Sequence, residues 1–170
     1  MNGHRRIFIG LGANLPGPDG PPRATLEAAL VALERAGLRL VRRSRWYESA
    51  PVPISDQPWY VNGVVEVETA LGPAALLALL HTVEASFGRT RRVRNQARPL
   101  DLDLLAYGER ILDGPDGPIL PHPRLHERAF VLLPLAEIAP DWRHPALGEG
   151  IRTLIGRLPK DQVTRPLAGG

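Results

Sequence analysis

The sequence predicts a mixed α+β fold in a single domain over residues 1–170, and three observations lead to that prediction. Segments whose apolar residues alternate, as in half-buried strands, are interspersed with segments whose apolar residues recur every three or four positions, as in amphipathic helices. The chain has 170 residues, enough for one domain with a sizeable core. Its 44% hydrophobic and 23% charged residues are ordinary for a globular protein and argue against wholesale disorder.

Four strands and two helices are predicted before the C-terminal third of the chain. Between residues 23 and 36 the apolar positions form one helical stripe, and Gly37 is placed to end that helix. Pro73 favours the first turn of a second helix, which closes near Gly88. The predicted strands are residues 6–11, 38–47, 60–68 and the segment that begins at 101, and the predicted helices are residues 23–36 and 73–88.

The resulting order, βαββαβ, is the ferredoxin-like arrangement, in which an antiparallel sheet carries both helices on one face. We expect the other face to be free to carry a ligand where loops and a C-terminal α-helical extension wall it in. After the last strand we predict a short returning strand at residues 109–112, a helix at 127–138 that ends before Pro140, a short helix at 153–158 and a weakly ordered tail at 159–170.

The composition excludes several classes of protein. There are no cysteines, so disulfides and thiolate metal sites are excluded, and a reducing compartment is the simplest location. The N-terminus does not resemble a signal peptide, and no apolar run approaches the ~20 residues of a membrane helix. The net charge is only +3, so arginines gathered near residue 90 indicate a specific anionic ligand more than a nucleic-acid surface. We expect a cytoplasmic monomer that binds neither nucleic acid nor a membrane.

The most informative motif is the pair Asp101 and Asp103, which alternates with Leu100, Leu102 and Leu104. Strand periodicity should project both carboxylates from one face, with their Cα atoms about 6.5–7 Å apart. Two neighbouring carboxylates repel each other, and a shared Mg²⁺ relieves that repulsion. An arginine cluster precedes the pair, and arginines together with Mg²⁺ are suited to a polyphosphate. The cluster consists of Arg89, Arg91, Arg92, Arg94 and Arg98.

The residues alone leave a simpler interpretation of this motif open. Asp-x-Asp on a strand is common on a solvated outer face, and an arginine-rich segment is often only a solvated loop. The combination of the two at this spacing favours a site for phosphate and metal, without excluding the simpler interpretation.

Three further segments each have two interpretations. Gly10 and Gly12 could belong to a phosphate-binding loop, but the third glycine of the dinucleotide fingerprint is missing and prolines follow, so we favour a tight turn. Tyr60 and Asn62 share a strand face and could bind a planar heterocycle or simply pack. Arg128 lies near a predicted helix start, against the helix dipole, which either a bound phosphate or plain surface exposure would explain.

No protein nucleophile stands out in the chain. It has no cysteine and no Gly-x-Ser-x-Gly elbow, and the placement of His122 between two prolines favours a loop anchor over a catalyst. The absence of a nucleophile fits phosphoryl-type transfer, in which the substrate supplies the nucleophile and the protein supplies positioning and charge.

Taken together, these motifs resemble the family of 6-hydroxymethyl-7,8-dihydropterin pyrophosphokinases, enzymes of folate biosynthesis. The resemblance runs from about residue 7 to residue 158, and its strongest part is Arg94-x-x-Ala-Arg98-x-x-Asp101-Leu-Asp103-Leu-Leu. Supporting motifs are Gly-x-Asn-Leu at 12–15, Asp56-Gln57-Pro58-x-Tyr60-x-Asn62, Glu84 with Gly88-Arg89-x-Arg91, and Pro121-His122 with Arg128-x-Phe130.

The resemblance implies Mg²⁺-dependent transfer of pyrophosphate from ATP to the pterin hydroxymethyl group, with release of AMP. It implies that Asp101 and Asp103 hold two Mg²⁺ ions, and that ATP is the co-substrate. The catalytic residues that it implies are Arg89, Arg91, Arg98, Asp101 and Asp103. The implied ATP-binding residues are Glu84, Arg91, Arg94, Arg98, Leu104, His122 and Arg128. The implied pterin-binding residues are Ser49, Ala50, Val52, Tyr60, Asn62, Asp101 and Phe130.

The chain departs from the family pattern at a few positions. Asn95 and Gln96 stand where the family often has a tryptophan and a small residue, and the arginine-rich loop is one residue shorter. His81, Ile119 and Pro123 differ from the residues that are usual around ATP. The departures therefore concern closure over the pterin and contacts to the nucleotide.

Two other function classes remain alternatives. An RNA-binding module would use the open sheet face, but the aromatic RNA-binding motif is absent, and Asp101 and Asp103 would repel phosphodiesters. A regulatory module would bind a nucleotide without producing AMP. The pair of carboxylates beside a separate slot for a pterin argues against that second class.

Overall fold

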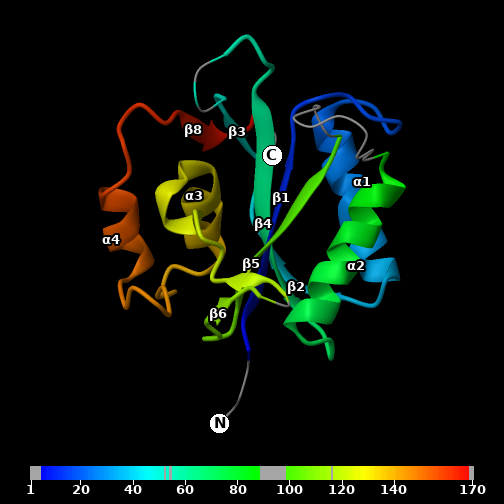
Figure 1. Ribbon diagram of the computed structural model, residues 1–170. Coiled ribbons are helices and arrows are strands. Elements are labelled where there is room, and N and C mark those ends of the chain that lie inside the picture. Colours follow the sequence, from blue (N-terminus) through cyan, green and yellow to red (C-terminus); the bar gives the residue numbers. More distant parts are fainter. Residues whose placement is uncertain (1–4, 52, 54, 89–98, 116, 169–170) are drawn as a thin grey trace.

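The computed structural model describes residues 5–51, 53, 55–88, 99–115 and 117–168, and shows one antiparallel sheet between two helical layers (Figure 1). Over these ranges no helix combines the length and the apolar character needed to cross a membrane. The elements are β1 (Ile7–Ala13), α1 (Pro22–Arg35), β2 (Arg39–Arg43), β3 (Tyr47–Ser49), β4 (Tyr60–Glu68), α2 (Pro73–Ser86), β5 (Asp101–Tyr107), β6 (Leu112–Asp113), β7 (Ile119–Leu120), the 3₁₀ helix η1 (Leu125–Glu127), α3 (Ala129–Ile138), α4 (Ile151–Gly156) and β8 (Thr164–Pro166).

The main sheet has the strand order β5-β1-β4-β3-β8, with β2 also paired to β4, and all of these pairings are antiparallel. Strand β1 lies between β4 and β5. Its register places Gly10 opposite Asp103 of β5, and places Gly12 between Asp101 of β5 and Asn62 of β4. The strand that carries the two aspartates is therefore paired with the two glycines of the central strand.

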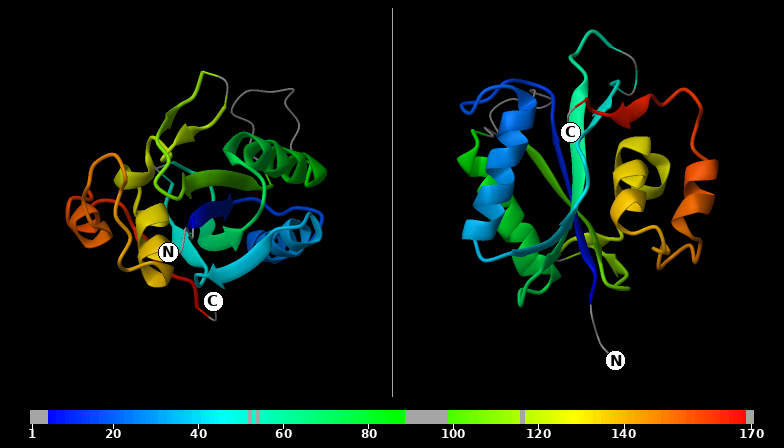
Figure 2. Two further views of the ribbon diagram at one scale, coloured as in Figure 1. Left: turned by 90° about the horizontal axis from the view of Figure 1, so that it is seen from below. Right: turned by 180° about the vertical axis from the view of Figure 1, so that it is seen from behind.

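The sheet separates two hydrophobic cores. The views from below and from behind show helices on both sides of the strands (Figure 2). The first core lies against α1 and α2 and contains Leu102 and Leu104 of β5. The second lies under α3 and α4 and contains Leu105, Leu132 and Leu154. Because side chains alternate along a strand, neighbouring residues of β5 belong to different sides of the sheet.

The predicted mixed class with an antiparallel sheet is confirmed, but some element boundaries differ. The strand predicted at 38–47 is divided into β2 and β3. Between them Ser44 Oγ accepts a hydrogen bond from the Val64 amide at 3.0 Å, and the Trp46 ring enters the first core. A Cβ atom on Gly63 would lie only 2.5 Å from that ring, so the glycine in β4 makes room for it.

The last part of the chain, for which the sequence predicted weak order, contains a strand. Strand β8 pairs with β3, with Thr164 opposite Ser49. The Leu167 amide donates a hydrogen bond to the Trp46 carbonyl at 2.8 Å. The segment between α4 and β8 therefore runs from the outer helix of the second layer back to the sheet (Figure 1).

Candidate active site

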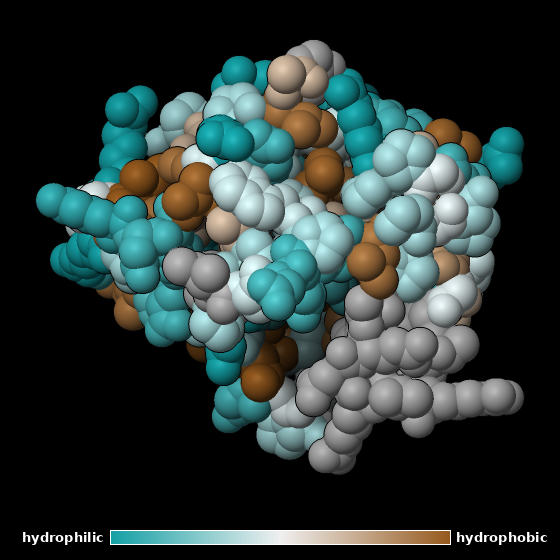
Figure 3. Space-filling model, turned by 90° about the horizontal axis from the view of Figure 1, so that it is seen from above, coloured by the Kyte–Doolittle hydropathy of each residue, from teal (hydrophilic) through white to brown (hydrophobic). Residues whose placement is uncertain are grey.

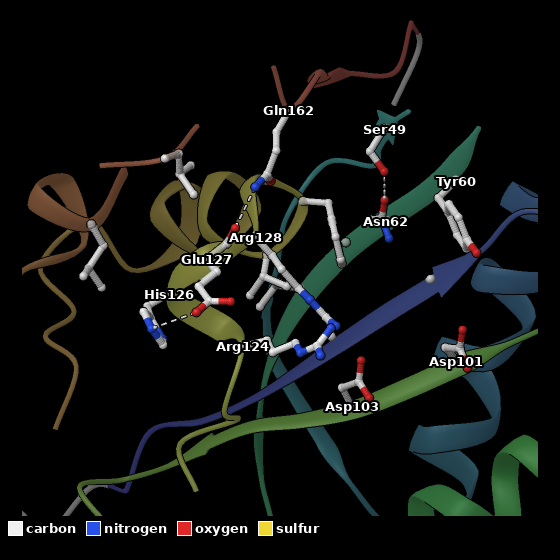
Figure 4. Close-up of a pocket in the computed structure, with 18 of the residues that line it drawn as sticks. Ser49, Tyr60, Asn62, Asp101, Asp103, Arg124, His126, Glu127, Arg128 and Gln162 are labelled. Carbon is white, nitrogen blue, oxygen red and sulfur yellow. Dashed lines mark hydrogen bonds and ion pairs between the residues drawn. The ribbon is translucent and has the colours of Figure 1, made fainter. Parts of the chain in front are cut away.

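A cavity of about 730 Å³ lies on the sheet face opposite α1 and α2. Residues of β1, β4 and β5 form its floor, and the start of α3 together with α4 and the segment that follows it forms its wall (Figure 4). Seen from above, this end of the molecule carries hydrophobic side chains in small groups among hydrophilic ones (Figure 3). The cavity brings together these residues predicted from the sequence: Ser49, Ala50, Tyr60, Asn62, Asp101, Asp103, Arg128 and Phe130.

Both predicted carboxylates line the cavity floor. Asp101 and Asp103 project from the same face of β5, whereas Leu102 and Leu104 are buried in the first core on the other face. The predicted alternation is therefore confirmed. Carboxylate oxygens are the donors that Mg²⁺ prefers, and Mg²⁺ usually takes only one or two protein carboxylates and completes its shell with water and substrate phosphates. The residues of β5 fit that requirement.

The glycines of β1 form part of the floor, which corrects the tight turn that the sequence favoured for Gly10 and Gly12. Gly10 and Gly12 lie within β1, which continues to Ala13, and both line the cavity. A Cβ atom on Gly12 would lie 2.9 Å from Asn62 Nδ2, closer than real Cβ contacts allow. The missing side chain at position 12 therefore leaves room for the Asn62 amide, and the sequence pattern alone did not distinguish this from a turn.

The orientation of Asn62 is set by a neighbour on the adjacent strand. The Ser49 hydroxyl donates a hydrogen bond to Asn62 Oδ1 at 2.6 Å, and Asn62 is 6% exposed. With its oxygen occupied in this way, the amide presents its Nδ2 donor to a ligand acceptor. Tyr60 lies two residues earlier on the same face, and burial and the charge of Asp101 raise the pKa of its hydroxyl. Tyr60 and Phe130 supply flat apolar surfaces beside that polar group.

Two guanidinium groups lie near the carboxylates. Arg124 and Arg128 line the cavity on the side of Asp103, as the close-up shows (Figure 4). Burial lowers the pKa of Arg128; the charge of Asp103 opposes that shift, while that of Arg124 adds to it. Over the described ranges neither guanidinium forms an ion pair. Two cations that line one cavity and form no ion pair with another described residue are suited to an anionic ligand.

Arg128 occupies the N-cap position of α3, which begins at Ala129, two residues later than the start at 127 that the sequence predicted. Its guanidinium lies 5.3 Å from the centroid of the Phe130 ring, a cation–π contact. The helix N-terminus carries partial positive charge, so Arg128 and the helix favour the same negatively charged partner. This placement puts a cation and an aromatic ring on one short stretch of chain that lines the cavity.

Three predicted residues lie outside the cavity lining. Glu84 of α2 is 2% exposed, and its carboxylate accepts a hydrogen bond from the Leu102 amide at 2.7 Å. The Leu104 side chain is part of the first core. His122 lies near Asp103, where burial lowers its pKa and Arg128 and Arg124 lower it further, while Asp103 opposes the shift.

Several predicted residues fall outside the described ranges. They are Val52 of the predicted pterin site, the predicted catalytic residue Arg89, and Arg91, Arg94 and Arg98 of the predicted ATP site. Asn95 and Gln96, where the chain departs from the family pattern, also lie outside these ranges.

Other lining residues escaped the sequence analysis. Arg124, His126 and Gln162 line the cavity, as do Leu154 and Arg157 from α4 and its end. Arg124 follows His122 by two positions, and a search for arginines next to the quoted motif would have found it. The residues after position 150 carry no comparable signal, because only the packing of α4 brings them to the site.

Comparison with known proteins directly tests the family resemblance that the sequence motifs indicate. The family model for 7,8-dihydro-6-hydroxymethylpterin-pyrophosphokinase matches residues 8–140. A 2-amino-4-hydroxy-6-hydroxymethyldihydropteridine pyrophosphokinase of Pseudomonas aeruginosa is 42% identical over 162 residues, covering 95% of this chain and 96% of its own length. A protein of the same name from Synechocystis is 45% identical and covers 86% of this chain and 73% of its own length.

A solved structure extends the comparison to the fold. The HPPK-DHPS triple mutant of Plasmodium falciparum superposes with a TM-score of 0.73 at 16% identity, over 92% of this chain and 44% of that longer chain. At that identity the likeness concerns the fold alone. It agrees with the mixed α/β architecture described above.

Proposed function

The chain belongs to the 7,8-dihydro-6-hydroxymethylpterin-pyrophosphokinase family, and on that premise we propose that it transfers pyrophosphate from ATP to the hydroxymethyl group of 6-hydroxymethyl-7,8-dihydropterin in folate biosynthesis. The products of this Mg²⁺-dependent reaction are AMP and the pterin pyrophosphate. The observation that carries the proposal is that Asp101 and Asp103 share one cavity with Arg124 and Arg128. Carboxylates for a metal opposite cations for phosphate are what the substrate of such a transfer requires.

In this proposal Asp101 and Asp103 hold Mg²⁺, with two ions expected from the family resemblance. The bound metal would supply charge neutralisation for the polyphosphate of ATP. Asp101, which lines the cavity close enough to Tyr60 for its charge to raise the pKa of that hydroxyl, would also orient the attacking hydroxyl group. The pterin itself supplies this nucleophile, which agrees with the absence of a protein nucleophile from the sequence.

The pterin would lie between the rings of Tyr60 and Phe130. Asn62, held by Ser49, would donate from Nδ2 to an acceptor on the pterin edge. Backbone groups at Ser49, Ala50 and Val52 would complete the pocket. The planar stacking surfaces and a donor of fixed direction suit a flat, polar heterocycle better than a flexible ligand.

The ATP phosphates would be bound from the side of α3. Arg128 and Arg124 lie there, with His122 close to Asp103. We keep Arg89, Arg91, Arg94 and Arg98 as phosphate-screening residues, and Arg89, Arg91 and Arg98 as catalytic, on the family resemblance. Glu84 and Leu104 remain part of the proposed nucleotide site, with Glu84 already bonded to the β5 backbone. Electrostatic preorganisation of this kind is usually the largest contribution to the rate.

We further propose that residues 1–170 form one pyrophosphokinase domain with the ferredoxin-like arrangement, acting as a cytoplasmic monomer. The strand order β5-β1-β4-β3, with α1 and α2 on one face, supports that arrangement. Its expected partners are ATP and the pterin, and neither nucleic acid nor a membrane.

A one-pot assay tests the function directly. Purified protein is mixed with ATP, Mg²⁺ and 6-hydroxymethyl-7,8-dihydropterin, and the products are separated by chromatography. We expect AMP and pterin pyrophosphate in equal amounts, and no turnover after chelation of the metal. ADP in place of AMP would mean ordinary phosphoryl transfer. ATP binding without any product would favour a nucleotide-binding module and contradict the proposal.

A further inference from the structure

The side chain of Gln162, between α4 and β8, contacts the backbone on both sides of Arg128. Its Oε1 accepts a hydrogen bond from the Ala129 amide at 2.8 Å. Its Nε2 donates one to the Glu127 carbonyl at 2.7 Å, which Figure 4 marks with a dashed line. Arg128 between them has an extended backbone, with φ −117° and ψ 114°. The side-chain amide therefore pairs with this extended residue much as a neighbouring strand would.

The helix that begins at Ala129 needs this contact. The first amides of a helix have no partner within the helix, and a capping side chain normally supplies an oxygen acceptor. Arg128 occupies the N-cap and makes no capping hydrogen bond, because a guanidinium carries donors only. Gln162 supplies the missing acceptor from 33 residues further along the chain. Arg128 is thereby free to direct its guanidinium into the cavity.

The next residue connects the same segment to the opposite side of the cavity. The Val163 carbonyl accepts a hydrogen bond from the Ala50 amide at 3.0 Å. Strand β8 then pairs with β3, which carries Ser49, the residue that orients Asn62. Two consecutive residues, Gln162 and Val163, thus connect the start of α3 to the edge of the sheet across the site.

We propose that Gln162 is a positioning residue that fixes Arg128 and Phe130 relative to the slot formed by Tyr60 and Asn62. It lies beyond residues 8–140, the part matched by the family model. The inference rests on the proposed function, because it assigns Arg128 to phosphate and Phe130 to the pterin. In physical terms, the position of the ATP phosphates relative to the pterin depends on a contact made by the C-terminal segment.

Three variants test the proposal. Gln162→Ala removes both hydrogen bonds, whereas Gln162→Glu retains an acceptor for the Ala129 amide and loses the donor to Glu127. Asp161→Ala is the matched control, since Asp161 is an exposed neighbour outside the cavity lining. Each protein is assayed for KM with ATP and with the pterin, and for hydrogen exchange of the Ala129 amide by NMR.

For Gln162→Ala we expect Ala129 exchange to accelerate and kcat/KM to fall about tenfold, mainly through higher KM values, because the substrate-binding groups of Arg128 and Phe130 are misplaced. Gln162→Glu should recover much of the Ala129 protection and part of the affinity, and Asp161→Ala should match the wild type. Faster Ala129 exchange with unchanged KM values would show that Gln162 only caps the helix, and would overturn the proposal. Ala129 exchange at the wild-type rate in Gln162→Ala would also overturn it. A wild-type protein that releases no AMP would contradict the proposed function instead, and the exchange data would still decide whether Gln162 holds the start of α3.

Discussion

The two faces of the main sheet are built by the same strands and differ in what their side chains do. On the face covered by α1 and α2, β5 contributes Leu102 and Leu104, which are 2% and 4% exposed. On the opposite face β5 contributes Asp101 and Asp103, and β1 contributes glycine at position 10, all of which line the cavity. One face is filled, and part of the other is left open with polar groups around it.

The difference shows that alternate residues of one strand have different tasks: one set stabilises the fold, and the other lines the candidate site. A glycine inside a strand costs roughly 0.5–1 kcal/mol relative to alanine, and two adjacent carboxylates repel each other. Both features are unfavourable for folding, and both lie on the face that lines the cavity. The apolar side chains of the first core, buried by α1 and α2, supply the compensating hydrophobic stabilisation.

Neighbouring residues of β5 give the most severe test of this division. Asp103→Ala should reduce Mg²⁺-dependent turnover by at least about 10²-fold while the Tm stays near that of the wild type, since the side chain faces the cavity. Leu102→Ala should lower the free energy of unfolding by about 2–5 kcal/mol through the space left in the first core. Its turnover per folded molecule should change little. Steady-state assays and thermal unfolding measure both effects, and a wild-type rate in Asp103→Ala would remove the metal assignment.

A side chain added at Gly12 should fill part of the cavity floor and so reduce the space for a ligand on the open face of the sheet. Gly12→Ala places a methyl group 2.9 Å from Asn62 Nδ2, so the amide must move. We expect pterin affinity to fall about tenfold, with a smaller change in the KM for ATP. Gly72→Ala is the control, because a Cβ atom there meets nothing within 4 Å. Fluorescence titration with the pterin measures the difference, and equal affinities for the two variants would refute this use of Gly12.

The cationic side of the cavity can be separated from the pterin side. Arg124→Ala should raise the KM for ATP by about five- to tenfold, because one charged hydrogen-bond donor is lost from the phosphate side. Pterin affinity should remain near the wild-type value. Arg110→Ala, an exposed arginine outside the cavity lining, is the matched control. If pterin binding weakens as much as ATP binding, then Arg124 belongs to the other half of the site.

The smallest expected effect concerns the pH dependence of stability on the side of α3 and α4. Burial lowers the pKa of His144, and the charge of His126 lowers it further. The unfolded chain therefore takes up the proton first, so the contribution of His144 is complete above its unfolded pKa of about 6.5 and declines as the pH falls below that value. His144→Asn should flatten the dependence of Tm on pH in that range. Parallel curves for wild type and His144→Asn would show that this histidine contributes no pH dependence.

Features that depend on local periodicity were predictable from the sequence. The alternation of Asp101 and Asp103 with leucines placed the carboxylates on one strand face, and the stripe after residue 23 predicted α1, because period and burial are coupled within a single element. Residues such as Tyr60 and Asn62 were predicted to share a face for the same reason. The structure confirms these placements, while their roles toward ligands remain predictions.

Features that depend on contacts between distant segments were not predictable. The sequence placed Gly12 in a turn. In the structure Gly12 belongs to β1 and lies opposite Asn62 of β4, whose amide needs the space that a side chain at position 12 would take. It assigned nothing to Gln162, which has no local pattern and acts on Ala129 across 33 residues. A tertiary hydrogen bond does not change the hydrophobic periodicity of either segment, so the sequence pattern does not reveal it.

By itself, the sequence determined the mixed class of the fold, the two carboxylates on one strand and the family to which the motifs belong. These follow from local periodicity and from short motifs whose residues lie close together in the chain. Only the tertiary structure decided that the start of α3 faces β5, that Arg124 joins Arg128 there, and that Gln162 connects the C-terminal segment to the site. The physical reason is that these contacts are set by how α3, α4 and β8 pack on the sheet, and packing depends on the shapes of all the surfaces at once.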